Sequence, residues 1–301
     1  MTQIRNFDML MEAARAKGQK RIAVAAPYDK GTVGAIKDAI DSGLAQLQLF
    51  GKKDKILAAL EQAGVDAAAV SLVDTPDTQS AIFQAVQSVR NGENQILMKG
   101  AVQTGALLKA SLDRTTGISL GRLASHLMVI EIPGYDRLII STDGGLNIAP
   151  NLMEKADIIR NAVDVARALG VEQPKVACIA AVEMVNPKMP ATMDAAMLSK
   201  MADRGVFGNA LVDGPLAMDN ILSAAAAEKK GIRSAVAGHA DILLSPSIEV
   251  GNVFSKTLSY VVHTLSAGIV AGTAAPIILP SRSSDPKSKY ASLALGVLLA
   301  K

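Results

Sequence analysis

The chain alternates short apolar runs with longer amphipathic stretches along nearly all of its 301 residues. This alternation is typical of βαβ units, in which helices cover parallel strands. The candidate strands are residues 21–27, 47–51, 70–74, 95–100, 127–133, 137–142, 175–182, 209–214, 241–246 and 276–280. We therefore predict an α/β protein in which most strands run parallel.

The alternation breaks where the candidate strands 127–133 and 137–142 follow one another with only residues 134–136 between them. This link is too short for a crossover helix, so the two strands are predicted to form an antiparallel hairpin. A hairpin that interrupts a parallel α/β chain indicates a boundary between domains. After it come a glycine loop, Pro150 and a long amphipathic stretch, which predict a helix that opens a second α/β unit.

Composition and charge limit the classes of partner. Half of the residues are hydrophobic, 3% are aromatic and Trp is absent, so the core must be built from Ala, Val, Ile, Leu and Met. The 31 Lys and Arg residues exceed the 28 Asp and Glu residues by 31 − 28 = 3, and the basic residues are scattered. This argues against nucleic-acid binding, which requires clustered positive charge. A small anionic ligand remains open.

Three segments bear on the location of the protein. Residues 1–21 contain two carboxylates where a secretory signal would need an unbroken apolar stretch. Residues 260–280 are the most membrane-like segment, but His263 and two glycines interrupt them, so they are predicted to form a core helix followed by a buried strand. Cys178, the one cysteine, lies in an apolar run and is interpreted as a small buried hydrophobe. These features predict a cytoplasmic protein.

The sequence does not contain a common catalytic or nucleotide-binding motif in the structural context that the motif requires. Residues 117–121 match the serine-hydrolase pattern G-x-S-x-G, but the stretch before them is polar and turn-like, so the serine is interpreted as a loop residue. No glycine precedes Gly51 at phosphate-loop spacing, and no G-x-G-x-x-G follows a strand. The histidines lie far apart without zinc-site spacing, so no metal is predicted and each is interpreted as structural: His126, His239 and His263.

Four predicted strands end in polar residues that can contact a ligand, at 99–104, 213–215, 245–256 and 281–289. At the first of these ends, Lys99 and Gly100 precede a helix predicted to begin near Thr104, so backbone N–H groups and an ammonium could face one anion. At the second, Gly214 precedes Pro215, which is predicted to start a helix. Ligands of open α/β sheets bind outside the carboxyl ends of the strands, so these ends predict one ligand site. The alternative for each end alone is a capped helix.

Longer blocks of sequence carry a resemblance to a known family. The blocks are IPGYDRLIISTDGGLNIAPNL, AAVEMVNPKMPATMDAAMLSKM, VDGPLAMDN, VAGHADILLSPSIEVGNV and APIILPSR. From about residue 20 to the C-terminus, the chain resembles the phosphate acetyltransferase and phosphate butyryltransferase family, and the butyryl branch most closely. The resemblance implies two three-layer α/β/α domains of the isocitrate/isopropylmalate dehydrogenase type with a cleft between them. It also implies reversible transfer of a short acyl group between coenzyme A and inorganic phosphate.

The resemblance further implies that the last strand and helix return to the first domain. With the hairpin as the boundary, the first domain is predicted to comprise residues 1–133 and 272–301, and the second residues 134–271. The coenzyme A thioester is implied as a substrate, together with phosphate and without a tightly bound cofactor or metal. A homodimer or larger homo-oligomer is expected, with no nucleic-acid or membrane partner.

Matching the family's motifs residue by residue implies the site. The Ser-Arg pair at the end of the last strand falls on Ser281 and Arg282. A guanidinium there can hold phosphate through two parallel bonds, and the serine hydroxyl can donate to the tetrahedral oxyanion. The predicted substrate-binding residues are those that match family motifs, Arg122, Asp143, Asn252 and Lys256, and those of the polar strand ends, Lys99, Gly100, Thr104 and Gly214.

The chain departs from the family pattern at the general base. The acetyl branch places an aspartate where Ser288 stands, and butyryl-type sequences place it where Ser284 stands. The nearest carboxylate, Asp285, is therefore assigned as the base toward the coenzyme A thiol, and Asp143 is the next candidate. The alternative for Asp285 is an N-cap of the helix that follows it. Tyr260 stands where acetyltransferases tend to carry an arginine, which fits a larger, more apolar acyl group.

Two other functions are considered beside the acyltransferase. A catalytically silent protein that binds or senses acyl-CoA would explain the displaced aspartate. A hydroxyacid dehydrogenase on a similar scaffold would need a metal-binding aspartate cluster, which the sequence lacks. Phosphate-dependent release of free thiol from butyryl-CoA separates the first of these from the acyltransferase.

Overall fold

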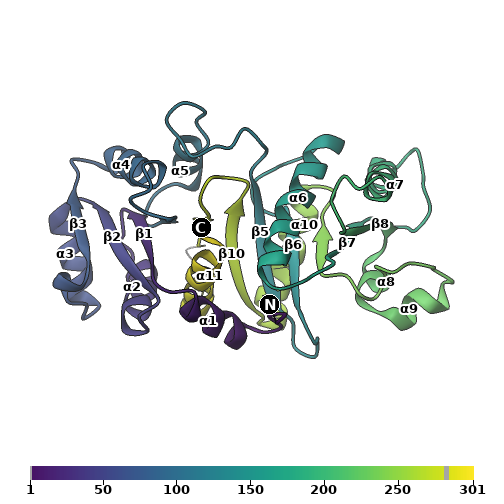
Figure 1. The fold of residues 1–301 in the computed structure, drawn as a ribbon, viewed down its shortest axis with the longest axis horizontal. Helices are drawn as coiled ribbons and strands as arrows, with labels where there is room; N and C mark the ends of the chain where they lie inside the picture. The colour runs from purple at the N-terminus through teal and green to yellow at the C-terminus, as the bar shows by residue number, and fades with distance from the viewer. Residues whose placement is uncertain (1, 281–284) are drawn as a thin grey trace. The chain divides into compact units, whose positions relative to one another are not determined.

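The computed structural model describes residues 2–280 and 285–301, and the chain forms two compact units (Figure 1). Unit 1 comprises Met1–Asn6 and Leu123–Leu265, and unit 2 comprises Phe7–Arg122 and Ser266–Lys301. Unit 2 therefore joins the first third of the chain to its C-terminal end. Both units contain helices and mainly parallel strands, so the prediction of an α/β protein is confirmed.

The strands of unit 2 follow the order β3-β2-β1-β4-β11-β10. Their bounds are β1 Lys20–Ala25, β2 Ala45–Gly51, β3 Ser71–Asp74, β4 Ile96–Lys99, β10 Leu265–Ala271 and β11 Ile277–Ile278. Neighbouring strands pair in parallel, except that β10 and β11 pair antiparallel. All four residues of β4 are buried, as expected of a strand inside a parallel sheet that is covered on both faces.

The helices of unit 2 are α1 Phe7–Ala16, α2 Lys30–Asp41, α3 Lys53–Gln62, α4 Thr78–Arg90, α5 Thr104–Ser111 and α11 Pro286–Leu299, with a 3-10 turn η1 at Ala67–Ala69. Helix α11 packs against α1 and α2, and α4 packs against β1, β2 and α5 (Figure 1). Most of α11 is buried, because its sequence from Ala291 onward is apolar apart from Ser292. The C-terminal helix is thus a core element of unit 2.

The strands of unit 1 follow the order β5-β6-β9-β7-β8. Their bounds are β5 Ser125–Glu131, β6 Leu138–Thr142, β7 Lys175–Ile179, β8 Leu211–Leu216 and β9 Ile242–Leu244. The helices are α6 Leu152–Ala168, α7 Pro190–Asp203, α8 Met218–Leu222, α9 Ala224–Lys229 and α10 Ile248–Thr257, followed by a π-helical turn η2 at Leu258–Val262. The predicted long helix after Pro150 is confirmed as α6, which begins with a capping box between Asn151 and Glu154.

The predicted hairpin is confirmed, because β5 and β6 pair antiparallel from Leu127 with Thr142 to Glu131 with Leu138. The division into compact units lies elsewhere than expected. Both strands of the hairpin belong to unit 1, and the division falls ahead of them, between Arg122 and Leu123. A hairpin shares its ladder of hydrogen bonds between its two strands, so it stays within one unit.

The prediction for residues 260–280 is wrong in one part. Each of the ten candidate strands overlaps an observed strand, but the expected core helix is absent, since residues 265–271 form strand β10. Ile269 and Val270 of β10 pair with β11, and β-branched residues suit such a ladder better than a helix. Within residues 2–280 and 285–301, no helix is long and apolar enough to cross a membrane.

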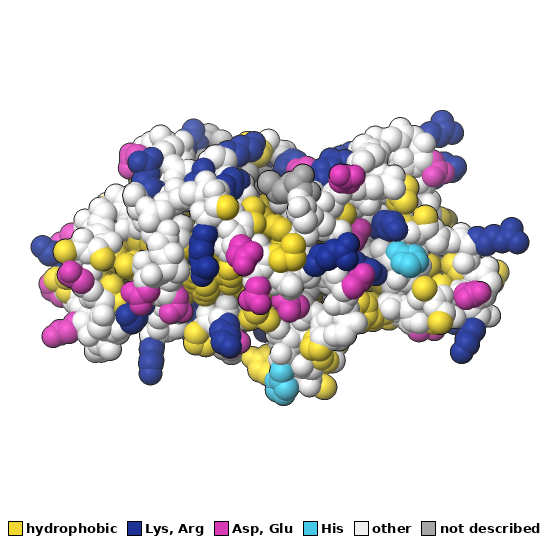
Figure 2. All heavy atoms as spheres, turned by 60° about the horizontal axis from the view of Figure 1, so that its bottom comes forward, with side chains coloured by type: hydrophobic (Ala, Val, Ile, Leu, Met, Phe, Trp, Pro, Cys, Tyr) yellow, Lys and Arg dark blue, Asp and Glu magenta, His cyan; other side chains and the backbone are white. Residues whose placement is uncertain are grey.

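The charged side chains are mixed on the surface. Figure 2 shows Lys and Arg interspersed with Asp and Glu over the face that it draws, without one large basic patch. Several of the ion pairs are local pairs along one helix, such as Lys37 with Asp41 and Lys200 with Asp203. This distribution agrees with the scattered basic residues in the sequence and gives that face no nucleic-acid footprint.

Candidate functional site

A pocket of about 370 Å³ lies at the carboxyl ends of β1, β4 and β11 in unit 2. We call it the lysine pocket, and it is lined by Asp29, Gly31, Thr32, Lys99, Gly100, Ala101, Pro280 and Lys289. Its position is the edge at which open α/β sheets bind ligands. Two of its residues, Lys99 and Gly100, belong to the site predicted from the sequence.

The start of α2 forms one wall of the lysine pocket. Asp29 is the N-cap, and its carboxylate accepts hydrogen bonds from the backbone N–H of Thr32 at 2.9 Å and from the Thr32 hydroxyl at 2.7 Å. These bonds fix the first turn of the helix at the pocket. The first N–H groups of a helix lack partners within it and carry partial positive charge, so this wall favours an anion.

Lys99 and Gly100 form a second wall, where the chain leaves β4. A Cβ atom on Gly100 would lie 2.3 Å from the carbonyl oxygen of Ala26, so only glycine fits this close passage. Lys99 is 5% exposed, and its ammonium donates to the carbonyl oxygens of Gly100 at 3.1 Å and Val102 at 3.4 Å. A buried ammonium is therefore held beside the start of α2.

Lys289, on the first turns of α11, supplies a second buried ammonium. Its side chain is packed so closely against α2 that a Cβ atom on Gly31 would lie 2.0 Å from its Nζ atom. Lys289 is 4% exposed, and among residues 2–280 and 285–301 its ammonium has no hydrogen bond or ion pair. A cation beside a helix N-terminus is unfavourable by itself. The pocket thus has two ammonium groups against one carboxylate, that of Asp29, and suits a phosphate group.

Lys289 is not among the site residues predicted from the sequence. The residue stands in the polar stretch after the last strand, but its burial depends on α11 packing against α2. The only signal was its place one turn after Pro286, the first residue of the helix. That spacing gives a helix face but not what the face packs against.

The predicted catalytic residues lie beside this pocket in the sequence. Ser281 and Arg282 are outside the described residues; they directly follow Pro280, which lines the pocket. Asp285 is the N-cap of α11, and its carboxylate accepts a hydrogen bond of 2.7 Å from the backbone N–H of Lys287. The capping alternative for Asp285 is therefore confirmed, while its role as a base stays a prediction.

Two other predicted residues of unit 2 do not line the lysine pocket. Thr104 is the first residue of α5, as the predicted helix start required, and it is exposed. Arg122 is exposed at the end of the first segment of unit 2. Ser119, the serine of the hydrolase-like pattern, forms only an isolated bridge with Thr273, so no strand leads to it and the loop interpretation is confirmed.

In unit 1, Asp143 organises the loop that follows β6. Its side chain is buried and accepts hydrogen bonds from backbone N–H groups and one side-chain amide: His126 N at 3.0 Å, Gly145 N at 2.8 Å, Leu146 N at 2.9 Å and Asn147 Nδ2 at 2.7 Å. A carboxylate that accepts several N–H bonds is committed to the loop. This geometry disfavours Asp143 as the alternative general base.

Asn252 lies close to the same loop. Its side-chain amide donates to the carbonyl oxygen of Gly144 at 3.1 Å. A Cβ atom on Gly251 would lie 2.6 Å from the carbonyl oxygen of Asp143, so two glycines permit α10 to approach the loop. Lys256 lies one turn further along α10, with its ammonium 5.7 Å from the ring centre of Tyr260. The structure thus brings Asp143 and Asn252 together, with Lys256 on the same helix.

His126 is a further residue of this group. Its ring lies against Gly145, where a Cβ atom would be 3.0 Å from Cγ, and its buried Nδ1 has no partner among the described residues. Burial lowers the pKa of His126, while the nearby Asp143 carboxylate raises it and the Lys256 ammonium lowers it. The imidazole is therefore neutral near pH 7. Sequence analysis interpreted this histidine as structural because no partner was visible.

The prediction around Gly214 is wrong in its local structure. Pro215 does not start a helix: β8 runs through Gly214 and Pro215 to Leu216, and α8 begins at Met218. A Cβ atom on Gly214 would lie 2.8 Å from Cβ of Cys178, so the glycine allows β8 to pack closely on β7. Cys178 is buried, and burial raises its pKa to about 12, which confirms its interpretation as a small hydrophobe.

Comparison with known proteins agrees with this picture. Residues 75–297 match the phosphate acetyl/butaryl transferase family. The chain is 43% identical over 297 residues to a phosphate butyryltransferase from Clostridium acetobutylicum, covering 99% of both chains. It is 41% identical over 294 residues to a phosphate acetyltransferase from Thermotoga maritima, covering 98% of this chain and 99% of that protein.

A solved structure supports the same assignment. The fold matches the crystal structure of a branched-chain phosphotransacylase from Enterococcus faecalis V583 with a TM-score of 0.84 and 30% sequence identity, covering 93% of this chain and 99% of that chain. No group of three or more His, Cys, Asp or Glu side chains that could hold a metal ion occurs in residues 2–280 and 285–301. The chain belongs to the phosphate acetyl/butaryl transferase family and is an acyltransferase.

Proposed function

We propose that this acyltransferase moves a short acyl group reversibly between coenzyme A and inorganic phosphate, and that the lysine pocket binds the phosphate. The observation that carries the proposal is the pair of buried ammonium groups, of Lys99 and Lys289, beside the first turn of α2. A phosphate dianion there would offset both ammonium charges and accept the N–H groups of the helix start.

The chemistry requires one bond to form and one to break. A phosphate oxygen attacks the thioester carbonyl carbon, and the tetrahedral intermediate expels the coenzyme A thiolate, leaving acyl phosphate. Arg282 would hold the phosphate beside the carbonyl, and the Ser281 hydroxyl would donate to the oxyanion. In the reverse direction Asp285 would take the thiol proton. These three roles follow from the family resemblance.

The acyl group is proposed to be butyryl or a branched group of similar size. Tyr260 in place of an arginine supports this, as does the similarity to proteins named phosphate butyryltransferase and branched-chain phosphotransacylase. We further propose that the protein acts in the cytoplasm, because a single buried cysteine fits a reducing compartment. A homo-oligomer is proposed from the family resemblance.

One assay tests the activity. The purified protein is given acetyl-, propionyl-, butyryl- or isobutyryl-CoA, and free thiol is measured with and without inorganic phosphate. Thiol release that requires phosphate, and is fastest with a four-carbon chain, is expected. Release that does not depend on phosphate would indicate a thioesterase, and binding of acyl-CoA without release would indicate the silent binding protein.

A substitution tests the phosphate site. Lys289→Met should raise the KM for phosphate by about 10- to 100-fold, because one charge-assisted hydrogen bond is worth about 1.5–3 kcal/mol. The KM for acyl-CoA should change little. Lys200→Met is the matched control, since Lys200 is exposed and pairs only with its helix neighbour Asp203. An unchanged KM for phosphate in Lys289→Met would remove the lysine pocket from the proposal.

A further inference from the structure

A second pocket lies in unit 1, and most of its lining side chains are polar. It is found at the amino ends of the strands of this unit. It encloses about 450 Å³, within the range of small-molecule sites. We call it the arginine pocket; its lining holds three cations, Arg5, Arg137 and Lys175, and three carboxylates, Asp136, Glu172 and Asp241, together with His239. Arg137 and Asp241 directly precede β6 and β9, and Lys175 begins β7, so the pocket lies at the amino ends of these strands. The residues matched to the acyl-transfer reaction do not include any of its charged groups.

Arg137 is held in a fixed orientation in this pocket. Its guanidinium donates to the carbonyl oxygens of Ala240 at 3.4 Å and Gly238 at 3.2 Å, and to the carboxylate of Asp136 at 2.9 Å. Its side chain is only 18% exposed. These bonds use three of the five N–H donors of a guanidinium, so the group is preorganised and still has donors for a ligand.

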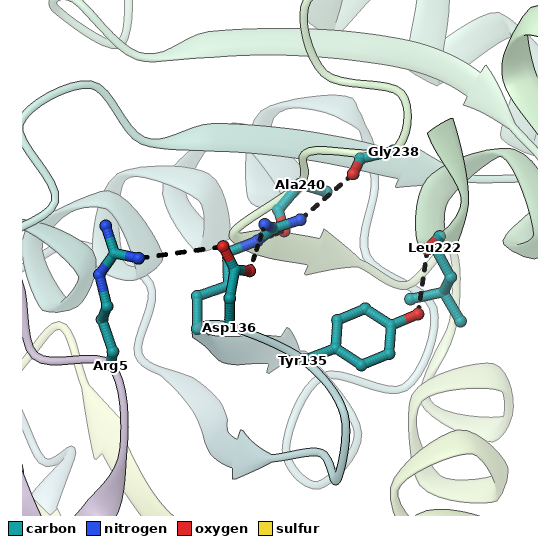
Figure 3. Close-up of polar contacts among 7 residues, drawn as sticks. Arg5, Tyr135, Asp136, Leu222, Gly238 and Ala240 are labelled. Atoms are coloured by element: carbon teal, nitrogen blue, oxygen red, sulfur yellow. Dashed lines mark hydrogen bonds and ion pairs between the residues drawn. The ribbon is translucent and has the colours of Figure 1, made fainter. Parts of the chain in front are cut away.

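Arg5 faces the same carboxylate from the N-terminal segment (Figure 3). Its guanidinium lies 3.9 Å from the Asp136 carboxylate, and the two side chains are 55% and 70% exposed. A pair that is this long and exposed contributes little stability, so Arg5 is not committed to it. One carboxylate thus serves two guanidinium groups, so the Arg5 guanidinium keeps N–H donors for a ligand.

Lys175 adds a third cation. The Asp241 carboxylate accepts a hydrogen bond of 2.9 Å from the backbone N–H of Lys175, which turns one of its oxygens toward the backbone. Burial raises the pKa of Asp241, against the lowering effect of the nearby Arg137 and Lys175 charges. Three cationic side chains, those of Arg5, Arg137 and Lys175, therefore line this one pocket beside three carboxylates.

We propose that the arginine pocket is a binding site for a small polar metabolite that carries a phosphate or carboxylate group, recognised by Arg137 together with Arg5 and Lys175. Guanidinium groups bind both oxyanions through paired N–H donors. Val171 is the only aliphatic side chain in the lining, so a polar body suits the pocket better than an acyl chain.

Titration calorimetry with three probes tests the site: inorganic phosphate, ribose 5-phosphate and succinate. Succinate and ribose 5-phosphate separate the carboxylate source from the phosphate source. Binding is measured in the Lys289→Met background, which weakens phosphate binding in the lysine pocket. At least one probe is expected to bind, and Arg5→Gln or Lys175→Gln should weaken it about tenfold or more, as expected for the loss of one charge-assisted bond.

Lys200→Gln is the matched control and should leave binding unchanged, because Lys200 lies on α7 and does not line the pocket. Arg137 is left intact, since its bonds to backbone carbonyl groups also support the fold. The proposal is overturned if none of the probes binds at about 10 mM, well above a weak dissociation constant of about 1 mM. Binding that neither Arg5→Gln nor Lys175→Gln changes would overturn it as well.

Discussion

Gly31→Ala should impair phosphate binding without harming the fold. The new Cβ atom would lie 2.0 Å from the Lys289 Nζ atom, and such contacts essentially never fall below 3.0 Å, so the ammonium must move by about that difference. The obstacle is the far end of a flexible side chain, so the displacement costs little in packing. Gly31 lies in α2 without a positive φ, and alanine is the better helix former by up to about 1 kcal/mol.

The expected kinetic effect follows from the lost contact. A displaced ammonium forfeits a charge-assisted hydrogen bond to phosphate worth about 1.5–3 kcal/mol, which raises the KM for phosphate about 10- to 100-fold. Initial rates of thiol release are measured against phosphate concentration at saturating acyl-CoA, and thermal unfolding is measured on the same samples. The melting temperature should be equal or slightly higher.

Gly34→Ala is the matched control, because Gly34 lies in the same helix and nothing stands within 4 Å of its added Cβ atom. It should gain the same helix propensity and leave the KM for phosphate unchanged. If the two variants have the same KM for phosphate, the ammonium of Lys289 does not contact the substrate. If Gly31→Ala unfolds instead, the close packing of Lys289 serves the fold.

Three further predictions concern single residues. Asp285→Asn keeps an oxygen that can accept from the backbone N–H of Lys287, whereas Asp285→Ala removes it, so only Asp285→Ala should lose about 1 kcal/mol of stability. If the carboxylate is the base, both variants should lose activity at least about a hundredfold. A fully active Asp285→Asn would show that another group is the base. Cys178, with its pKa raised to about 12, should resist iodoacetamide at pH 8 in the folded protein and react after unfolding; fast labelling of the native protein would contradict its burial. The raised pKa of Asp241 means that the folded state binds more protons than the unfolded state from about 3.8 up to the folded pKa, so stability should fall as pH rises through that window; Asp241→Asn, whose amide oxygen can still accept from Lys175, should flatten this slope in denaturant titrations.

The strands were predictable because their apolar runs are bounded by polar turns, and the hairpin because residues 134–136 leave no room for a helix. Strand β10 could not be predicted, because its run of alanine, glycine and β-branched residues suits a helix and a strand about equally. Its pairing with β11, only a short turn away, decides the structure. A short window of sequence does not contain this pairing between β10 and β11, so it cannot predict the strand.

The site was only partly predictable for the same reason. Lys99 and Gly100 follow a strand directly, and the carboxyl end of a parallel strand is a general place for ligands. Lys289 and Gly31 are far apart in sequence and meet only because α11 packs against α2. The helix start predicted at Pro215 was wrong, because a Gly-Pro pair is typical of a helix start, whereas here Gly214 and Pro215 continue β8 past Cys178.

The buried ammonium groups of the lysine pocket are expected to lower the stability of the phosphate-free protein while they support phosphate binding. Burying an ammonium without a partner costs free energy, so Lys289→Met, which keeps the length and removes the charge, should make the phosphate-free protein more stable. A gain of about 1 kcal/mol would raise the melting temperature by about 1.5 °C in a protein of 301 residues. Phosphate at about 100 times its dissociation constant should stabilise the parent by about 2.7 kcal/mol and the variant far less. The order of the two melting curves should therefore reverse when phosphate is added. If Lys289→Met is less stable than the parent even without phosphate, the ammonium stabilises the fold through its own partners, and the pocket is not an anion site.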